Sequence, residues 1–237
     1  AYEAVVVRST WDYHHRPAEF VQWIARLEAA GVRVWNPPAL LRWNLDKHYL
    51  AELGGQGVAV VPTRTVPQHS GASLPAALAS AGWDEAVVKP AVSASAHETW
   101  RTSRARAERD AARFAALVHA GDVLVQPYLH AIEQGEWSLC FLGGRYSHAV
   151  LKRPRHGDFR VQSELGGEVL VARPEPGLVA RAEEIVARLP APWLYARVDA
   201  CEVNGALVLM ELELIEPTLF FHADLSAPTR FAQALRA

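Results

Sequence analysis

The order of apolar and polar positions predicts an α/β protein in which strands alternate with helices. Residues 4–8 (AVVVR) form a short β-branched run, which is typical of a strand. Across residues 17–30 apolar side chains recur at spacings of three and four behind Pro17, which predicts a helix. Gly31 ends that helix and residues 32–35 predict a second strand, so the chain opens with one βαβ unit.

Asn36-Pro37-Pro38 separates this unit from the rest, because residues before proline avoid the helical conformation. The pattern then predicts a helix over 45–53, strands over 58–63 and 85–90, a helix over 103–119, a strand over 122–126, a hairpin of 137–142 and 145–152, a helix over 176–189, and a final hairpin of 194–203 and 206–215. A loop with Pro67, Ser70, Gly71 and Pro75 is expected after the strand at 58–63.

Composition narrows the class of protein. Half of the 237 residues are hydrophobic, 21% are charged and the net charge is −2, which excludes an intrinsically disordered chain. With 24 basic and 26 acidic residues there is no basic excess for nucleic acid, and the longest apolar runs are too short to cross a bilayer. The two cysteines, Cys140 and Cys201, cannot form a disulfide framework. We therefore expect a cytoplasmic protein without nucleic-acid or membrane partners.

The sharpest local signal for chemistry is a pair of glutamates in an apolar strand. Side chains alternate in direction along residues 206–215 (ALVLMELELI), so Glu211 and Glu213 share one face, about 6.5–7 Å apart. Burying both carboxylates is unfavourable unless cations neutralise them, and Mg²⁺ suits paired carboxylates completed by water and phosphate oxygens. The alternative is an exposed face on which Glu alternates with Leu, and the two glutamates alone leave both open.

Asp199 lies in the preceding strand (YARVDACEV), and Arg197 shares its face. The register of the hairpin decides what Asp199 meets. With a two-residue turn at Asn204-Gly205, Asp199 is opposite Met210 and points away from the glutamates. With a three-residue loop it is opposite Glu211, and only this second register builds a metal site.

Two lysines occupy positions where a lysine needs a partner. Lys89 ends a valine-rich strand, and Lys47 stands at the start of the helix over 45–53, where the helix dipole disfavours a cation unless an anion is near. The alternative for each is a solvated surface lysine. The small residues of 90–96, with Ser93 and Ser95, form a loop whose N–H groups can approach phosphates, although it lacks glycine.

His14 and His15 lie beside Asp12 on an expected loop. Such a group could hold a metal ion, but the sequence offers no third ligand at a usable spacing. We therefore expect a surface or substrate-facing role for the two histidines.

Taken in order, the motifs between residues 44 and 216 resemble the ATP-grasp superfamily, and within it the glutathione synthetase and ribosomal protein S6 modification ligase branch. The segments that carry the resemblance are 44–47 (NLDK), 88–90 (VKP), 125–129 (VQPYL), 135–136 (GE), 152–153 (KR), 157–160 (GDFR), 166–167 (GG), Asp199 and 210–213 (MELE). Residues 8–13 (RSTWDY) and 211–217 (ELELIEP) are also similar to a bacterial subgroup that includes the ligase of cycloserine biosynthesis. The resemblance implies an ATP-grasp fold, in which two α/β subdomains clasp ATP.

The resemblance also implies three tasks for the motif residues. Nucleotide binding falls to Lys47, Lys89, Ser93 and Ser95 on the phosphates, to Gln126, Tyr128 and Leu129 on adenine, and to Glu136 on the ribose, with Glu133 as the alternative. Two Mg²⁺ ions, or Mn²⁺, would be held by Asp199, Glu211 and Glu213. Arg160, Lys152 and Arg197 would stabilise the transferred phosphoryl group and the acyl phosphate that follows.

Two departures from the family pattern bear on turnover. Glu213 stands where the family commonly has Asn, which adds a negative charge to the site. The loop around Ser93 and Ser95 carries serine and alanine where glycines are usual.

The implied function is an ATP-dependent carboxylate–amine or cyclising ligase. It would act through an acyl phosphate on an amino-acid or peptide-like substrate and release ADP and phosphate, and the resemblance allows a homodimer. One alternative is a catalytically degenerate ATP-grasp module that binds nucleotide without turnover. Another is an acid-rich metal hydrolase that uses no nucleotide.

We expect three parts in the chain. These are a partial N-terminal α/β domain over residues 1–43, a small ATP-grasp subdomain over 44–124, and a C-terminal subdomain with the metal-binding hairpin over 125–237. Family members carry more than one βα unit before the ATP-binding halves, and this sequence starts at Ala1 without a Met. We therefore expect an exposed sheet edge beside residues 4–8.

Overall fold

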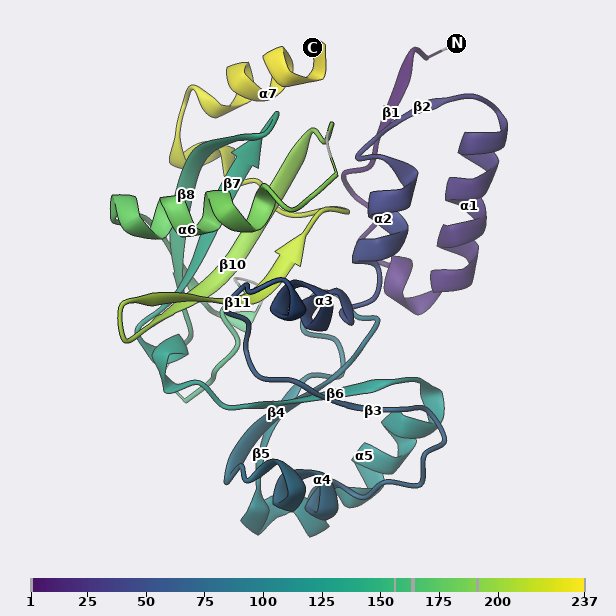
Figure 1. Cartoon of the computed structure of the whole chain (residues 1–237), viewed down its shortest axis with the longest axis vertical. Coiled ribbons are helices and arrows are strands. Elements are labelled where there is room, and N and C mark those ends of the chain that lie inside the picture. The colour runs from purple at the N-terminus through teal and green to yellow at the C-terminus, as the bar shows by residue number, and fades with distance from the viewer. Residues whose placement is uncertain (1, 156, 163–164, 191, 237) are drawn as a thin grey trace.

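The computed structural model describes residues 2–155, 157–162, 165–190 and 192–236, and its strands form three sheets (Figure 1). The strands and helices are β1 (Ala4–Val6), α1 (Pro17–Ala29), β2 (Arg33–Trp35), α2 (Pro38–Asn44), α3 (Tyr49–Gly55), β3 (Arg64–Val66), α4 (Leu74–Ala81), β4 (Glu85–Pro90), β5 (Trp100–Ser103), α5 (Ala107–Ala120), β6 (Val123–Pro127), β7 (Glu136–Leu142), β8 (Arg145–Arg153), β9 (Glu168–Val171), α6 (Pro176–Val186), β10 (Tyr195–Val203), β11 (Ala206–Glu213) and α7 (Ala227–Arg236). Short 3-10 helices include η1 (Tyr13–His15) and η3 (His130–Glu133). The chain is a mixed α/β protein, as predicted.

The N-terminal unit has the predicted βαβ order. Strands β1 and β2 pair in parallel, and α1 packs Phe20 and Ile24 against Val7 and Val34. Among the described strands β1 pairs with β2 alone and is only partly buried, so the expected open edge beside it is confirmed. Ala1 lies outside the described residues.

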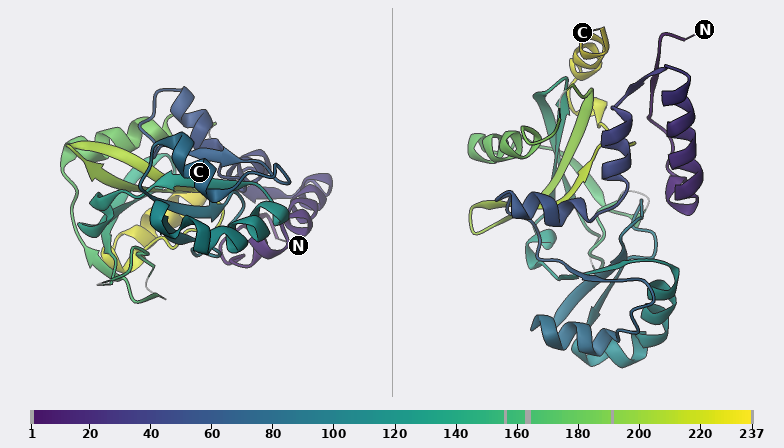
Figure 2. Two further views of the ribbon diagram at one scale, coloured as in Figure 1. Left: turned by 90° about the horizontal axis from the view of Figure 1, so that it is seen from below. Right: turned by 45° about the vertical axis from the view of Figure 1, so that its right-hand side comes forward.

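The four-stranded sheet has the order β3-β6-β4-β5, and each neighbouring pair is antiparallel. Helices α4 and α5 cover one face, where Leu78 and Phe114 pack against Val88 and Val125. This sheet and its two helices form one end of the molecule (Figures 1 and 2).

The five-stranded sheet has the order β11-β10-β7-β8-β9. Helix α6 covers one of its faces, where Ala196, Val198 and Ala200 of β10 enter the core with Ile185. Because side chains alternate along a strand, Arg197 and Asp199 point to the opposite face, toward the four-stranded sheet.

A β-bulge sets the register of the β10–β11 hairpin. The turn is the two-residue Asn204-Gly205, since Val203 pairs with Ala206, yet Asp199 pairs with Glu211 because the register shifts at Met210. The sequence argument allowed this pairing only with a three-residue loop and is wrong on that point, because it left out a bulge. The extra residue keeps the leucines before and after it in the core and turns both glutamates to the other face.

Helices α2 and α3 are fastened to β11. The Asn44 side chain donates to the Leu212 carbonyl at 2.7 Å and accepts from the Leu214 N–H at 2.8 Å. The Tyr49 hydroxyl lies 3.0 Å from the same Leu212 carbonyl. These bonds place the intervening Lys47 beside the glutamates of β11.

Several predicted elements need correction. Residues 58–63 are not a strand; they make one isolated bridge, Val60 to Leu209, and the strand β3 follows them. The helix predicted over 45–53 begins at Tyr49 and runs to Gly55. The expected loop after residue 63 contains α4, because Pro75 lies in its first turn and Ser73 caps it. Helices α2 and α7 and strands β5 and β9 were not predicted.

Two further expectations touch the fold. No helix in the described ranges is long and apolar enough to span a membrane. The division at residues 43/44 and 124/125 stays a prediction: α3 packs with the five-stranded sheet, and the second boundary falls inside β6.

Candidate active site

A cavity of about 540 Å³ lies between the four-stranded and five-stranded sheets. That volume is typical of a site for a small molecule or cofactor. All the residues predicted for the site line it, namely Lys47, Lys89, Ser93, Ser95, Gln126, Tyr128, Leu129, Glu136, Lys152, Arg160, Arg197, Asp199, Glu211 and Glu213. Their assigned tasks remain predictions, but the fold brings every one of them to the same place.

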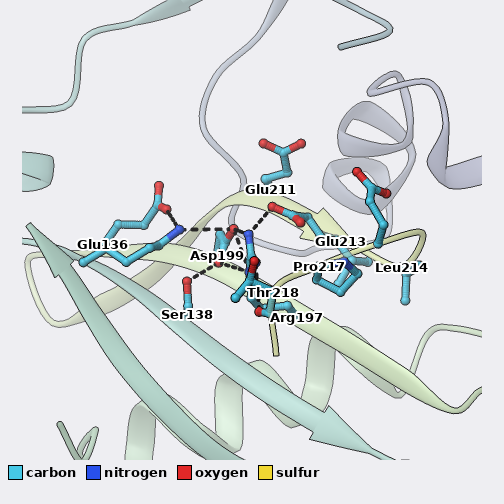
Figure 3. Close-up of polar contacts among 12 residues, drawn as sticks. Glu136, Ser138, Arg197, Asp199, Glu211, Glu213, Leu214, Pro217 and Thr218 are labelled. Atoms are coloured by element: carbon cyan, nitrogen blue, oxygen red, sulfur yellow. Dashed lines mark hydrogen bonds and ion pairs between the residues drawn. The ribbon is translucent and has the colours of Figure 1, made fainter. Parts of the chain in front are cut away.

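The floor of the cavity is a network of charges on β7, β8, β10 and β11 (Figure 3). Asp199 is held by Arg197 at 2.8 Å, by Lys152 at 3.4 Å and by the Ser138 hydroxyl. Lys152 also contacts Glu136 at 2.6 Å. All five side chains are buried, where an uncompensated charge would be costly. The contacts above compensate each of the charges.

Arg197 also pairs with Glu213 across the hairpin. Glu213 stands where the family pattern has Asn, and Arg197 compensates the negative charge that Glu213 adds. Burial raises the pKa of Glu213, and the nearby Asp199 and Glu211 raise it further, while Arg197 opposes them.

Asp199 and Glu211 remain ionised for different reasons. Burial alone would raise the pKa of Asp199, but Arg197 and Lys152 outweigh it and hold that pKa below its usual value. Burial likewise opposes ionisation of Glu211, and Lys47 and Lys89 together lower its pKa. Both carboxylates are therefore available as anionic oxygen ligands at neutral pH.

Lys47 joins the hairpin to the loop that follows β4. Its ammonium lies 3.2 Å from Glu211 and donates to the Ser93 carbonyl, and its backbone N–H donates to the Ala91 carbonyl at 3.0 Å. The lysine is buried, so the solvated surface role is wrong for Lys47.

Lys89 projects into the same cavity from β4 and makes no ion pair within the described ranges. Burial lowers its pKa, and Glu211 offsets only part of that effect. Its ammonium therefore faces the cavity without a carboxylate partner in the described structure.

The loop after β4 adopts backbone conformations that favour glycine. Ser95 and Ala96 have φ of 51° and 54°, and Glu98 has φ of 50°. Side chains in this left-handed region cost roughly 1–2 kcal/mol each. Ser95, Ala96 and Glu98 therefore leave the loop strained.

Part of the cavity lining is apolar, and its side chains pack together. Val87, Ile132, Met210 and Tyr128 belong to this part. The Tyr128 N–H already donates to the Glu85 carbonyl at 3.0 Å, and Arg101 stacks over the Tyr128 ring with 3.6 Å from its guanidinium carbon to the centroid. These two contacts hold the Tyr128 backbone and ring against β4 and β5.

The structure distinguishes the two candidate ribose acceptors. Glu136 lines the cavity and is buried beside Lys152. Glu133 has a 54% exposed side chain, accepts from the Tyr128 hydroxyl at 3.0 Å and does not line the cavity. The geometry favours Glu136.

Arg160 reaches the cavity from the loop between β8 and β9, of which His156, Ser163 and Glu164 lie outside the described residues. Asp158 holds it with contacts of 3.1 and 2.9 Å, and these hydrogen bonds lower the pKa of Asp158 to about 2. A side chain at Gly167 would meet the Val161 carbonyl oxygen at 2.3 Å, so the loop closes only with glycine there.

Sequence reasoning assigned no role to several other residues that line the cavity, among them Trp11, Tyr13 and Glu216. The Trp11 indole donates to the Glu216 carbonyl at 3.4 Å, which joins the N-terminal segment to the end of β11. The segments 8–13 and 211–217 both carry the likeness to the bacterial subgroup. They belong together because they form one wall.

The donor set fits Mg²⁺. Asp199 and Glu211 are direct cross-strand partners and both offer carboxylate oxygens to the cavity, and Glu213 stands on the same face (Figure 3). Mg²⁺ needs only one or two protein carboxylates, because water and phosphate oxygens complete its octahedron.

Comparison with known proteins identifies the family and the fold of this chain. The family model described as D-cycloserine synthetase DcsG, N-terminal domain, matches residues 1–36. The cycloserine biosynthesis protein DcsG of Streptomyces lavendulae is 35% identical over an aligned length of 250 residues. The alignment covers 99% of this chain and 82% of that protein. The crystal structure of D-cycloserine synthetase DcsG matches with a TM-score of 0.87 at 33% identity, over 99% of this chain and 83% of that one. A RimK domain ATP-grasp protein from Sphaerobacter thermophilus DSM 20745 matches with a TM-score of 0.70 at 19% identity, over 99% and 80% of the two chains.

The fold is therefore that of the ATP-grasp ligases, as the sequence motifs implied. The chain belongs to the family of the cycloserine biosynthesis protein DcsG and is an ATP-dependent ligase that forms a C–N bond with release of ADP and phosphate.

The strain in the loop after β4 gives a stability prediction. Ala96→Gly removes the Cβ from a residue at φ 54°, so we expect a gain of about 0.5–1 kcal/mol in the free energy of unfolding after the entropy of the extra glycine is subtracted. Urea unfolding measures it. Ala94→Gly is the matched control and should lose up to about 1 kcal/mol, because Ala94 has no positive φ. A loss for Ala96→Gly equal to that of the control would show that the loop is not strained.

Proposed function

We propose that the chain activates the carboxylate of an amino-acid substrate as an acyl phosphate and closes an amide-type bond to a nitrogen nucleophile, in the same molecule or in a second one. The observation that carries this proposal has two parts in one cavity. Lys89 is a cation that makes no ion pair within the described ranges, and Asp199 and Glu211 are ionised carboxylates on paired positions of the hairpin. The first arrangement suits a phosphate chain, and the second suits the divalent cation that accompanies it.

The lining suggests how the nucleotide would lie. The apolar part of the lining beside Tyr128 and Leu129 suits adenine, and Glu136 stands next to it for the ribose. Lys47 and Lys89 would hold the phosphates from two sides, with hydroxyl and N–H donors from Ser93 and Ser95.

Asp199, Glu211 and Glu213 would hold Mg²⁺. When bound, the ion neutralises phosphate charge and orients the terminal phosphate. Since Mg²⁺ would compete with Arg197 and Lys152 for the same carboxylates, we propose that these two cations turn toward the transferred phosphate as the site fills.

The proposed reaction has two steps. A carboxylate oxygen of the substrate attacks the terminal phosphorus of ATP, and ADP leaves; the nitrogen nucleophile then attacks the acyl carbon, and phosphate leaves with that oxygen. Arg160, Lys152 and Arg197 supply positive charge where negative charge develops. The ion pair with Asp158 keeps the Arg160 guanidinium at the cavity wall.

The wall of Trp11, Tyr13 and Glu216 is proposed as the place of the amino-acid substrate. Glu216 is 8% exposed and has no ion pair within the described ranges. Burial raises its pKa to about 7, with Lys47 opposing and Glu211 adding to the shift. A substrate ammonium beside this carboxylate would favour its ionised form, so Glu216 is suited to bind an amino group. The relatives are named for D-cycloserine, a small amino-acid derivative, which agrees with this choice.

The structure weighs against both alternative functions. The glycine-poor loop still has the left-handed residues, and Arg197 compensates Glu213, so neither departure marks a degenerate site. The unpaired Lys89 has no task in a metal hydrolase. Mn²⁺ in place of Mg²⁺, a homodimer, a cytoplasmic location and the absence of nucleic-acid and membrane partners stay predictions.

Hydroxylamine provides a test that does not require the natural nucleophile, because it traps acyl phosphates as hydroxamates. With ATP and Mg²⁺, a panel of D- and L-amino acids should yield hydroxamate for a subset of one configuration. Asp199→Asn should lower the rate about 100-fold or more, because it removes the charge that organises both cations and metal.

Asp84→Asn is the matched control for that loss. Its side chain is 86% exposed and contacts only Arg104 in the described structure, so the rate should equal that of the unaltered chain. MgATP binding without hydroxamate from any amino acid would contradict the ligase and favour the nucleotide-binding module.

Glu216→Gln tests the substrate wall. We expect KM for the amino acid to rise about 10–100-fold, because one hydrogen bond between charged groups is lost. KM for ATP should stay the same. Steady-state phosphate release measures both constants. Glu202→Gln, at an exposed position outside the cavity, should change neither. A rise in KM for ATP alone would place Glu216 on the nucleotide instead.

A further inference from the structure

A cluster of three histidines lies beside the cavity and has no part in the proposed reaction. His14 and His15 belong to η1, and His97 comes from the loop between β4 and β5. The ring centroids are 4.0 Å apart for His14–His15, 5.1 Å for His14–His97 and 4.7 Å for His15–His97. The sequence argument stopped at two histidines because nothing in the order of residues brings His97 to them.

The geometry of the cluster is close to that of a metal site. One nitrogen from each ring lies within 4.8 Å of the other two, and within the described ranges these are the only three His, Cys, Asp or Glu residues that meet that distance. Tetrahedral Zn²⁺ with Zn–N bonds of about 2.0–2.1 Å needs nitrogens about 3.4 Å apart. His15 and His97 are exposed, so small ring rotations can supply the remaining approach.

One ring nitrogen of the cluster is also buried without a partner within the described ranges. The Nδ1 atom of His14 is buried and has no hydrogen-bond partner in the described structure.

We propose that His14, His15 and His97 bind one divalent transition-metal ion, Zn²⁺ being the test ion, and that this ion fastens η1 to the loop that follows β4. Imidazole ligands select Zn²⁺ and similar ions, whereas the carboxylates on the cavity floor select Mg²⁺, so the two sites differ in chemistry. Three histidines leave one coordination position open to water.

The position of the site gives the ion a consequence for the loop. Tyr13, next to His14, and Ser95 and Ala96, next to His97, all line the cavity. A metal bridge would hold the substrate wall and the loop in one arrangement. This inference does not rest on the proposed ligase reaction, because metal binding is measured without substrates.

The test is a Zn²⁺ titration of the full chain against a chromogenic chelator, in excess Mg²⁺ so that the carboxylate site does not bind Zn²⁺. We expect one tight Zn²⁺ per chain and a Kd at least about 100-fold weaker in His97→Ala and in His15→Ala. Both side chains are exposed, so neither substitution should unfold the protein. Co²⁺ at the same site should give visible absorption bands of a low-coordinate ion, lost in both variants.

His119→Ala is the matched control. His119 lies on α5 beside His69, with centroids 4.9 Å apart, but this pair has no third ligand within the described ranges. It should bind Zn²⁺ as tightly as the unaltered chain. Equal Zn²⁺ affinity in the unaltered chain and His97→Ala, or an equal loss in His119→Ala, would overturn the proposal.

Discussion

The buried carboxylate of Asp199 is the constraint on which the site depends. It lies on β10, between β11 and β7, and its charge is compensated by Arg197 from the same strand and by Lys152 from β8. Leaving such a charge unpaired costs about 3–5 kcal/mol, so β7, β8 and β10 must align with this register. The bulge at Met210 then brings Glu211 opposite Asp199 while the leucines of β11 stay in the core. The need to compensate the Asp199 charge thus sets both the strand register and the arrangement of the cavity floor.

Lysine and arginine are unevenly distributed in this chain. The sequence contains only three lysines, Lys47, Lys89 and Lys152, and all three line the cavity, whereas every other member of the 24 basic residues is an arginine. Lysine presents a compact charge on a flexible stem, whereas the planar guanidinium of arginine forms fixed bidentate pairs with carboxylates and phosphates. Arg42 and Arg101 form such pairs with Glu28 and Glu85.

The sequence patterns selected residues that share one cavity, whereas several elements of secondary structure were missed. The motif residues lie around one cavity, where charges of opposite sign compensate one another. Strands with a clear alternation of apolar and polar residues, such as β7, β8 and β10, were predicted nearly to the residue. The bulge at Met210 escaped because no local residue signals it, and α4 escaped because Pro75 was taken as a breaker. Glu216 and His97 were missed because their partners lie far away in the sequence. Glu216 contacts Trp11, and His97 contacts His14. Only the folded chain brings such pairs together.

The account's central claim is that a substrate carboxylate, rather than water or a nucleotide phosphate, accepts the terminal phosphoryl group in this cavity. Oxygen-18 in the carboxylate of the amino acid with the highest hydroxamate yield tests it most directly. Mass spectrometry of the phosphate released with hydroxylamine or the natural nucleophile should find one labelled oxygen per phosphate, carried over when the acyl–oxygen bond breaks. Unlabelled phosphate, or label in AMP, would contradict the account.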